Sequence, residues 1–160
     1  MSSTASNSGE PDLQWAPQEV FDSILQYAVI PTFDLILDTP NGILLVRRQI
    51  EPYKNRWALP GLRMLKGETP NTCIERIGRT EVGLELDAGK KEFVGQAVKI
   101  FRDHHNRQDL STCYAFRIDT ADFRLNPDHL SDSLFVRDVT ESPGSLGDLY
   151  RQHLECYLNR

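Results

Sequence analysis

The chain has few cysteines and no long apolar segment. Its three cysteines, Cys73, Cys113 and Cys156, are far apart and form no Cys-x-x-Cys pair, which argues against a disulfide framework or a zinc site. No apolar run approaches the roughly 20 residues that a membrane helix needs. Residues 1–9 lack both basic charge and an apolar stretch, so the sequence predicts no secretory signal. We therefore expect a cytoplasmic protein with free thiols and no membrane partner.

Positive charge is also scarce. The chain has 18 Lys and Arg against 23 Asp and Glu, which gives a net charge of −5. This balance excludes a generally basic coat for nucleic acid, because such binding depends on many cations that displace counterions. Net charge does not describe distribution, so a local basic pocket stays possible. With 160 residues, the chain is long enough for about one domain.

The order of helical and strand patterns predicts an α+β domain. Residues 1–12 are rich in serine, glycine and asparagine and are predicted to be a disordered tail, whereas residues 13–160 contain no linker. Apolar residues at helical spacing predict helices from 17 to near 31, over 70–82 and over 146–158. Strands are expected over 33–37, 42–46, 57–59, 93–101, 111–118 and 134–139, the first two joined by an Asn-Gly turn.

The segment 57–84 combines a bend, a turn and a helix in a way that suits a divalent cation. Gly61 follows a proline in a bend whose carbonyl can face a ligand. Glu68 precedes the helix, and Glu81 lies near its end. Arg76 follows Glu68 by eight residues, so the two side chains can meet. Because carbonyl and carboxylate oxygens suit Mg²⁺, we predict a magnesium site that uses Gly61, Glu68 and Glu81.

This segment resembles the Nudix box, and the residues that carry the resemblance are Gly61, Glu68, Arg76, Glu81 and Gly83. The resemblance implies a single Nudix-like domain over residues 13–160, folded as an α/β/α sandwich with a mixed sheet. It also implies an enzyme that hydrolyses a nucleoside diphosphate linked to another group. The chain departs from the box at Leu62, where a glycine would fall, and at Ile77 and Thr80, where acids would stand.

One branch of the family, the GDP-mannose mannosyl hydrolases, lacks the same two helix acids. The chain is similar to that branch over about residues 17–140. The resemblance implies that the Gly61 carbonyl and Glu81 bind Mg²⁺, and that a second set of residues contacts the nucleotide, phosphate or leaving group: Asp34, Arg48, Arg63 and Arg76. Water would attack the anomeric carbon of a nucleotide sugar, while Arg48, Arg63 and the metal neutralise the departing diphosphate. A homodimer is also implied.

The branch places its general base, a histidine, in a late loop after a Pro-Asp pair. Here that loop is 126–132, and His129 stands two residues before the expected position, which Ser131 fills. A shift of the loop would bring His129 into place as the base. His104 and His105, in another loop, are the substitutes.

Other interpretations stay open. An ordinary Nudix enzyme attacks phosphorus, although here the helix has lost two acids. A Nudix-fold protein that binds a nucleotide without turnover fits the replacements at Leu62, Leu130 and Ser131. For Arg76, a salt bridge to Glu68 that orients the loop competes with a contact to substrate.

Overall fold

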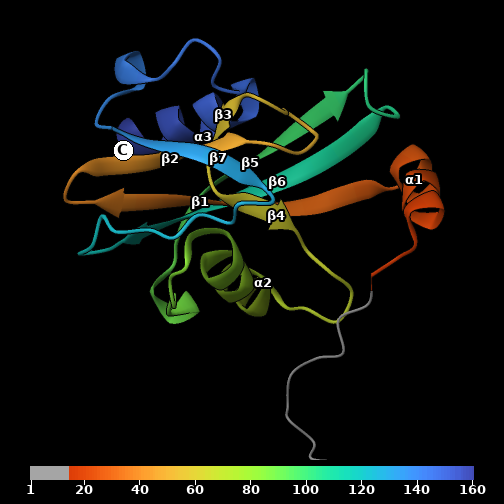
Figure 1. Ribbon diagram of the computed structural model, residues 1–160, viewed down its shortest axis with the longest axis horizontal. Coiled ribbons are helices and arrows are strands. Elements are labelled where there is room, and N and C mark those ends of the chain that lie inside the picture. The colour runs from red at the N-terminus through yellow and green to blue at the C-terminus, as the bar shows by residue number, and fades with distance from the viewer. Residues whose placement is uncertain (1–14) are drawn as a thin grey trace, which may run out of the picture.

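The computed structural model describes residues 15–160 and shows a sheet with helices on both faces (Figure 1). The predicted tail at residues 1–12 lies outside the described residues. Within residues 15–160, no helix is long and apolar enough to cross a membrane. The strands are β1 (Val29–Thr39), β2 (Gly42–Arg48), β3 (Trp57–Ala58), β4 (Gly61–Arg63), β5 (Glu92–Phe101), β6 (Arg107–Arg117) and β7 (Leu130–Val136). The helices are α1 (Gln18–Tyr27), α2 (Pro70–Ile77) and α3 (Asp148–Leu158), with short turns η1 (Gly78–Val82), η2 (Ala88–Lys90) and η3 (Val139–Glu141).

The sheet is mixed. Its main strand order is β3-β2-β1-β6-β5, with β4 also paired to β1 and β7 paired to β2. β1 and β6 are parallel along almost their whole length, whereas the other named strand pairs are antiparallel. This mixed sheet between helices confirms the predicted α+β fold.

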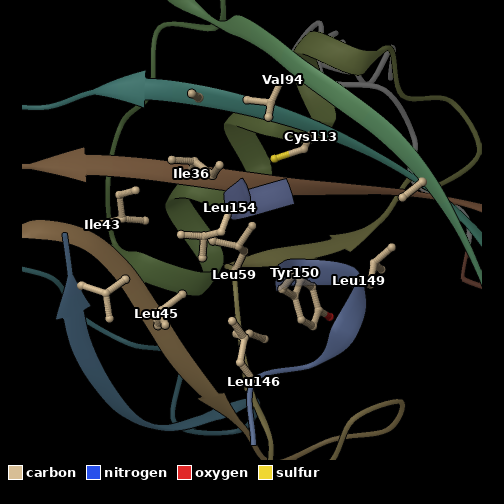
Figure 2. Packing of buried hydrophobic residues seen from close by; sticks show 14 of the residues in the cluster. Ile36, Ile43, Leu45, Leu59, Val94, Cys113, Leu146, Leu149, Tyr150 and Leu154 are labelled. Carbon is tan, nitrogen blue, oxygen red and sulfur yellow. The ribbon is translucent and has the colours of Figure 1, made fainter. Parts of the chain in front are cut away.

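The two faces of the sheet bury separate apolar clusters. Side chains alternate along β1, so Leu35 and Leu37 pack on the side of α2, whereas Ile36 packs on the side of α3. Figure 2 shows Leu154 and Tyr150 of α3 in the cluster that contains Ile36. Toward the beginnings of β1 and β6, the face that carries Ile36 becomes polar. The functional candidates lie at this end, beside α1 (Figure 1).

Several element boundaries differ from the prediction. β1 begins at Val29 rather than at 33, because its ladder with β6 starts there and continues through a proline. β4 is absent from the prediction, since Pro60 and Gly61 read as a break, yet Gly61 already belongs to the strand and pairs with Asp34 of β1. β7 covers Leu130–Val136 rather than 134–139, because its pairing with β2 extends to the end of that strand.

The helix predicted over 70–82 begins as expected but changes character. Thr69 caps it, since the Thr69 hydroxyl accepts a hydrogen bond from the Thr72 amide at 3.2 Å, and Pro70 occupies the first turn. The α-helix ends at Ile77 and continues as the π-helical turn η1. Gly83 ends the turn with a φ of 70°, the left-handed conformation expected at a helix end.

Candidate functional site

A cavity of about 240 Å³ lies where the beginning of α3 meets β1, β4, β6 and the loop after β2. Most of the predicted site residues line it: Asp34, Arg48, Gly61, Arg63, Arg76 and His129. Glu68 and Glu81 are not among the lining residues, but each contacts one that is. The structure therefore brings residues from distant parts of the sequence to one place.

Gly61 and Asp34 face each other on the floor of this cavity. They are opposite in the antiparallel β1–β4 pair. The hydrogen bonds of this pair involve the flanking residues, including Leu35 with Pro60, so the Gly61 carbonyl points away from β1. A side chain at Gly61 would press against the Asp34 carboxylate and lie 2.6 Å from the Phe33 carbonyl oxygen. Glycine is thus required for this close approach.

Asp34 belongs to a buried chain of polar groups. The Ser111 hydroxyl donates to Asp34 Oδ2 and lies 2.8 Å from His153 Nε2. Burial raises the pKa of Asp34 to about 7, although the bond from Ser111 and the charge of Arg48 oppose this rise. Burial lowers the pKa of His153 to about 4, so the imidazole is neutral at pH 7. When Asp34 is ionised, the Ser111 hydroxyl uses its single hydrogen in the bond that it donates to Asp34. The Ser111 oxygen then accepts a hydrogen bond from Nε2–H of His153.

Arg76 and Glu68 form a buried ion pair beside the cavity. Arg76 Nε donates to Glu68 Oε1 at 2.5 Å, and Nη2 donates to Glu68 Oε2 at 3.0 Å and to the Arg63 carbonyl at 2.8 Å. The Leu65 amide also donates to Glu68 at 2.8 Å. Burial opposes ionisation of Glu68, but these hydrogen bonds prevail and lower its pKa. Glu68 therefore links the loop between β4 and α2 to α2 itself, and both of its carboxylate oxygens accept hydrogen bonds from the protein.

Glu81 and His129 meet although 48 residues separate them. The π turn carries Glu81, which is 2% exposed, to a position where its Oε1 lies 2.7 Å from His129 Nδ1. Asn126 Nδ2 donates to the same oxygen at 3.2 Å, and the Asn126 amide donates to the Glu81 carbonyl at 2.9 Å. Because Nδ1 faces Glu81, Nε2 is the imidazole nitrogen available to other groups. His104 and His105 lie in the β5–β6 turn and are not among the residues lining the cavity.

Arg48 and Arg63 supply positive charge to the cavity. Arg48 is held by the loop after β2, since its Nε donates to the Pro52 carbonyl at 2.7 Å. The Arg63 guanidinium lies 4.0 Å from the centre of the Phe21 ring. Burial and the nearby charges of other arginines lower the pKa of Arg63. Within residues 15–160, neither Arg48 nor Arg63 forms an ion pair with a carboxylate, which leaves their charge for an anionic ligand.

Sequence reasoning missed two charged residues of the cavity wall, Arg107 and Asp109 of β6. The prediction placed them in a loop, whereas β6 begins at Arg107. Arg107 Nε donates to Asp109 Oδ1 at 2.6 Å, and both side chains are buried. Burial raises the pKa of Asp109, although Arg107 opposes the rise. No clear alternation marks this part of the strand, because Gln108 and Thr112 on the other face are polar as well.

The oxygen donors around the cavity fit Mg²⁺ only sparsely. Within residues 15–160, no group of three or more His, Cys, Asp and Glu side chains is placed to hold a metal. The Gly61 carbonyl points away from β1, and both side-chain hydrogen bonds to Glu81 in the described residues use Oε1, which leaves Oε2 for a cation. Mg²⁺ accepts such a set, because it commonly binds one or two carboxylates and completes its coordination with water and substrate phosphate.

Comparison with known families decides the class of protein. The model of the NUDIX domain matches residues 30–142, which is well over half of the chain. The chain belongs to the Nudix family. Enzymes of this family hydrolyse nucleotide derivatives and typically use divalent metals. Membership agrees with the fold described above and with the loop–helix segment that contains Gly61, Glu68 and Glu81.

Individual Nudix relatives are distant. The chain is similar to a MutT Nudix hydrolase from Burkholderia pseudomallei, with 18% identity and a TM-score of 0.69 over 79% of this chain and 95% of that chain. It is also similar to the Nudix domain of NrtR from Shewanella oneidensis, crystallised with ADP ribose, with 20% identity and a TM-score of 0.69 over 91% and 93% of the two chains. A curated relative, the low-salt glycan biosynthesis protein Agl8 of Haloferax volcanii, is 27% identical over 70 residues. That match spans 44% of this chain and 45% of the relative, less than half the length of either.

Proposed function

We propose that the chain is a Mg²⁺-dependent hydrolase of a nucleotide sugar, of the GDP-mannose type, which cleaves the bond to the anomeric carbon. The observation that carries this proposal is the contact of 2.7 Å between His129 Nδ1 and Glu81 Oε1 at the wall of a cavity that Arg48 and Arg63 also line. A histidine fixed by a carboxylate is suited to act as a general base. The products would be the free sugar and the nucleoside diphosphate.

His129 and Glu81 would act together on the attacking water. Glu81 Oε1 accepts a hydrogen bond from Nδ1–H of His129, which fixes the tautomer in which Nε2 is unprotonated. That nitrogen takes the proton from water as the oxygen attacks the anomeric carbon. His129 is one-third exposed, so water can reach it, whereas Glu81 is buried behind it. Glu81 thereby orients the base even though it does not line the cavity itself.

Arg48 and Arg63 would receive the departing diphosphate. Each can donate hydrogen bonds to phosphate oxygens as negative charge accumulates there. The Gly61 carbonyl and Glu81 Oε2 are the donors that would hold Mg²⁺, and a bound Mg²⁺ supplies further neutralisation of the leaving group. Glu68 would not serve as a ligand, because both of its oxygens accept hydrogen bonds from the protein.

The environment of the two missing helix acids supports attack on carbon rather than on phosphorus. Ile77 is fully buried in the core, and the Thr80 hydroxyl donates to the Arg76 carbonyl at 2.8 Å. Neither position offers a carboxylate to a second metal. The helix is therefore better suited to a single metal that neutralises the departing diphosphate, as attack on carbon requires. The ADP ribose bound to one relative and the glycan biosynthesis named for another support a substrate that carries a sugar.

Analysis of the products tests this proposal. Incubation with GDP-mannose and Mg²⁺ is expected to release mannose and GDP, separated by ion-exchange chromatography. His129→Gln should slow the reaction by about 10²-fold or more, because the base is lost. Formation of GMP and sugar phosphate would favour phosphorus attack instead. Binding without turnover across a panel of nucleotide sugars would favour a non-catalytic nucleotide-binding protein, and either result would refute the proposal.

A further inference from the structure

A buried ion pair on β6 has no part in the chemistry proposed above. Arg107 and Asp109 are 8% and 4% exposed, and both line the cavity that holds Arg48 and Arg63. They are two residues apart on one strand, so their side chains project from the same face of the sheet. The short contact from Arg107 Nε to Asp109 Oδ1 fixes each group against the other.

Stability alone does not account for this pair. Removing two charges from water costs several kcal/mol per ion, and apolar residues of similar size often serve a fold equally well. The core directly above contains such residues on the same face of β6, namely Cys113 and Ala115. The charged pair instead occupies the part of β6 where the sheet lines a cavity.

The pair still has hydrogen-bonding capacity directed at a ligand. Within residues 15–160, Asp109 Oδ2 and the terminal nitrogens of Arg107 form no hydrogen bond to a protein side chain. A carboxylate oxygen beside guanidinium donors matches two neighbouring hydroxyl groups, because each hydroxyl can donate to the first and accept from the second. A flat nucleobase fits this wall less well: Arg63 already covers Phe21, and Phe101 packs edge-on against Tyr53 at 4.9 Å.

We propose that Arg107 and Asp109 form a subsite for the vicinal hydroxyls of a sugar ring. This inference rests on the proposed function, because the ring is part of the same nucleotide sugar whose diphosphate lies on Arg48 and Arg63. Arg107 and Arg76 are close enough to affect the ionisation of Arg63, which puts the subsite beside the phosphate-binding charge. The hydroxyls can belong to the ribose or to the appended sugar, and the chemistry of recognition is the same.

Calorimetric binding of four ligands in the presence of Mg²⁺ tests this subsite, and all proteins in the titration carry His129→Gln so that the sugar nucleotides are hydrolysed about 10²-fold or more slowly while they bind. The ligands are inorganic pyrophosphate, GDP, GDP-mannose and 2′-deoxy-GDP-mannose, and the variants are Asp109→Asn and Arg107→Lys. Asp109→Asn should raise the Kd of GDP-mannose about tenfold or more, as expected for loss of a hydrogen bond to a charged group, and change that of pyrophosphate less than about twofold. Arg107→Lys keeps the positive charge beside Asp109 but removes the paired N–H donors of the guanidinium. It should therefore raise the Kd of GDP-mannose by a smaller factor than Asp109→Asn does, and again change that of pyrophosphate less.

The ligand pattern identifies which sugar is bound. If the ribose is bound, Asp109→Asn weakens GDP and GDP-mannose equally and weakens the 2′-deoxy compound less, because that compound keeps only one of the two hydroxyls. If the appended sugar is bound, GDP is unaffected and both sugar nucleotides weaken. Glu92→Gln, which removes an exposed ion pair with Arg160 away from the cavity, is the control and should bind all four ligands as the parent does.

Three results would overturn the inference. Equal weakening of pyrophosphate and sugar nucleotides in both variants would show that the pair serves only the general charge of the cavity. Unchanged Kd values for every ligand in folded variants would show that it contacts none of them. If the parent chain binds pyrophosphate but no sugar nucleotide, the proposed function fails, and the subsite with it. A defect in folding would lower the number of binding sites rather than change the ratio between ligands.

Discussion

Gly61→Ala is the substitution that most sharply tests the close approach of β4 to β1. The backbone of Gly61 is not in the left-handed region, so alanine brings no conformational penalty of its own. Its Cβ, however, would lie 2.6 Å from the Phe33 carbonyl oxygen and closer still to the Asp34 carboxylate. The Asp34 carboxylate can rotate away from the new Cβ, but the Phe33 carbonyl is part of the β1 backbone and cannot. The strands must therefore separate by a few tenths of an ångström or more.

This separation should affect both stability and activity. Overpacking of this kind costs about 1–3 kcal/mol. For a chain of this length, each kcal/mol shifts Tm by about 2–4 °C, so we expect Tm to fall by about 2–12 °C. The Gly61 carbonyl would move with its strand, and because a displacement of about 1 Å can slow turnover by about 10²-fold, we expect a loss of up to that size. Differential scanning calorimetry and steady-state rates over a range of Mg²⁺ concentrations measure the two effects.

Gly95 provides the matched control. It also lies in a strand, but a Cβ there would meet nothing within 4 Å. Gly95→Ala should therefore keep the Tm within about 2 °C of the parent and the rate unchanged. If Gly61→Ala behaves like Gly95→Ala, the approach of β4 to β1 is looser than described and the Gly61 carbonyl is not a fixed ligand.

Three further substitutions address the buried ionisable groups. Glu81→Gln should reduce Mg²⁺-dependent turnover by about 10²-fold or more, and an unchanged rate would place both the metal and the support of the base elsewhere. Glu68→Gln leaves Arg76 buried without its ion partner and should lower the free energy of unfolding in urea by about 3–5 kcal/mol, whereas a loss below about 1 kcal/mol would show that the pair is screened by solvent. His153 has a pKa of about 4 in the fold against about 6.5 when unfolded, so the unfolded chain binds more protons between these values and stability falls as pH is lowered. Between pH 7 and pH 5 the loss of stability due to His153 is about 2 kcal/mol. His153→Gln should lack this loss when its free energy of unfolding is compared with that of the parent at both pH values. The raised pKa of Asp34 gives stability the opposite pH dependence, but it does so in both proteins and therefore cancels in the comparison. Equal pH dependence in parent and variant would show that His153 is not buried as a neutral group.

Local signals in the sequence predict much of the fold. The hairpin between β1 and β2, the cap at Thr69 and the end of the helical segment at Gly83 all depend on neighbours within a few residues, and the structure confirms each. The turn of the hairpin is Pro40–Asn41 rather than the predicted Asn-Gly pair, of which only Gly42 has a positive φ, 120°. The extent of β1 depends instead on a partner strand far along the chain, so its start could not be placed from its own residues. The same is true of β4, which is a strand only because β1 lies beside it.

In the site, too, features that depend on neighbouring residues could be predicted, whereas those that depend on distant segments could not. The bend at Pro60 directly before Gly61 and the meeting of Glu68 with Arg76 lie within one segment and could be anticipated from the sequence. The contact between Glu81 and His129 requires both the π turn and the folding of a distant loop, which no local pattern encodes. The role of His129 as base, the metal ligands and the homodimer stay predictions, since each depends on a ligand or a partner.

The most direct test of the account is hydrolysis of GDP-mannose in ¹⁸O-labelled water with Mg²⁺, followed by mass spectrometry of both products. The account predicts that the label enters the released mannose and that GDP carries none, because His129 directs water to the anomeric carbon. Label in a phosphate product would show that water attacks phosphorus and would contradict the account.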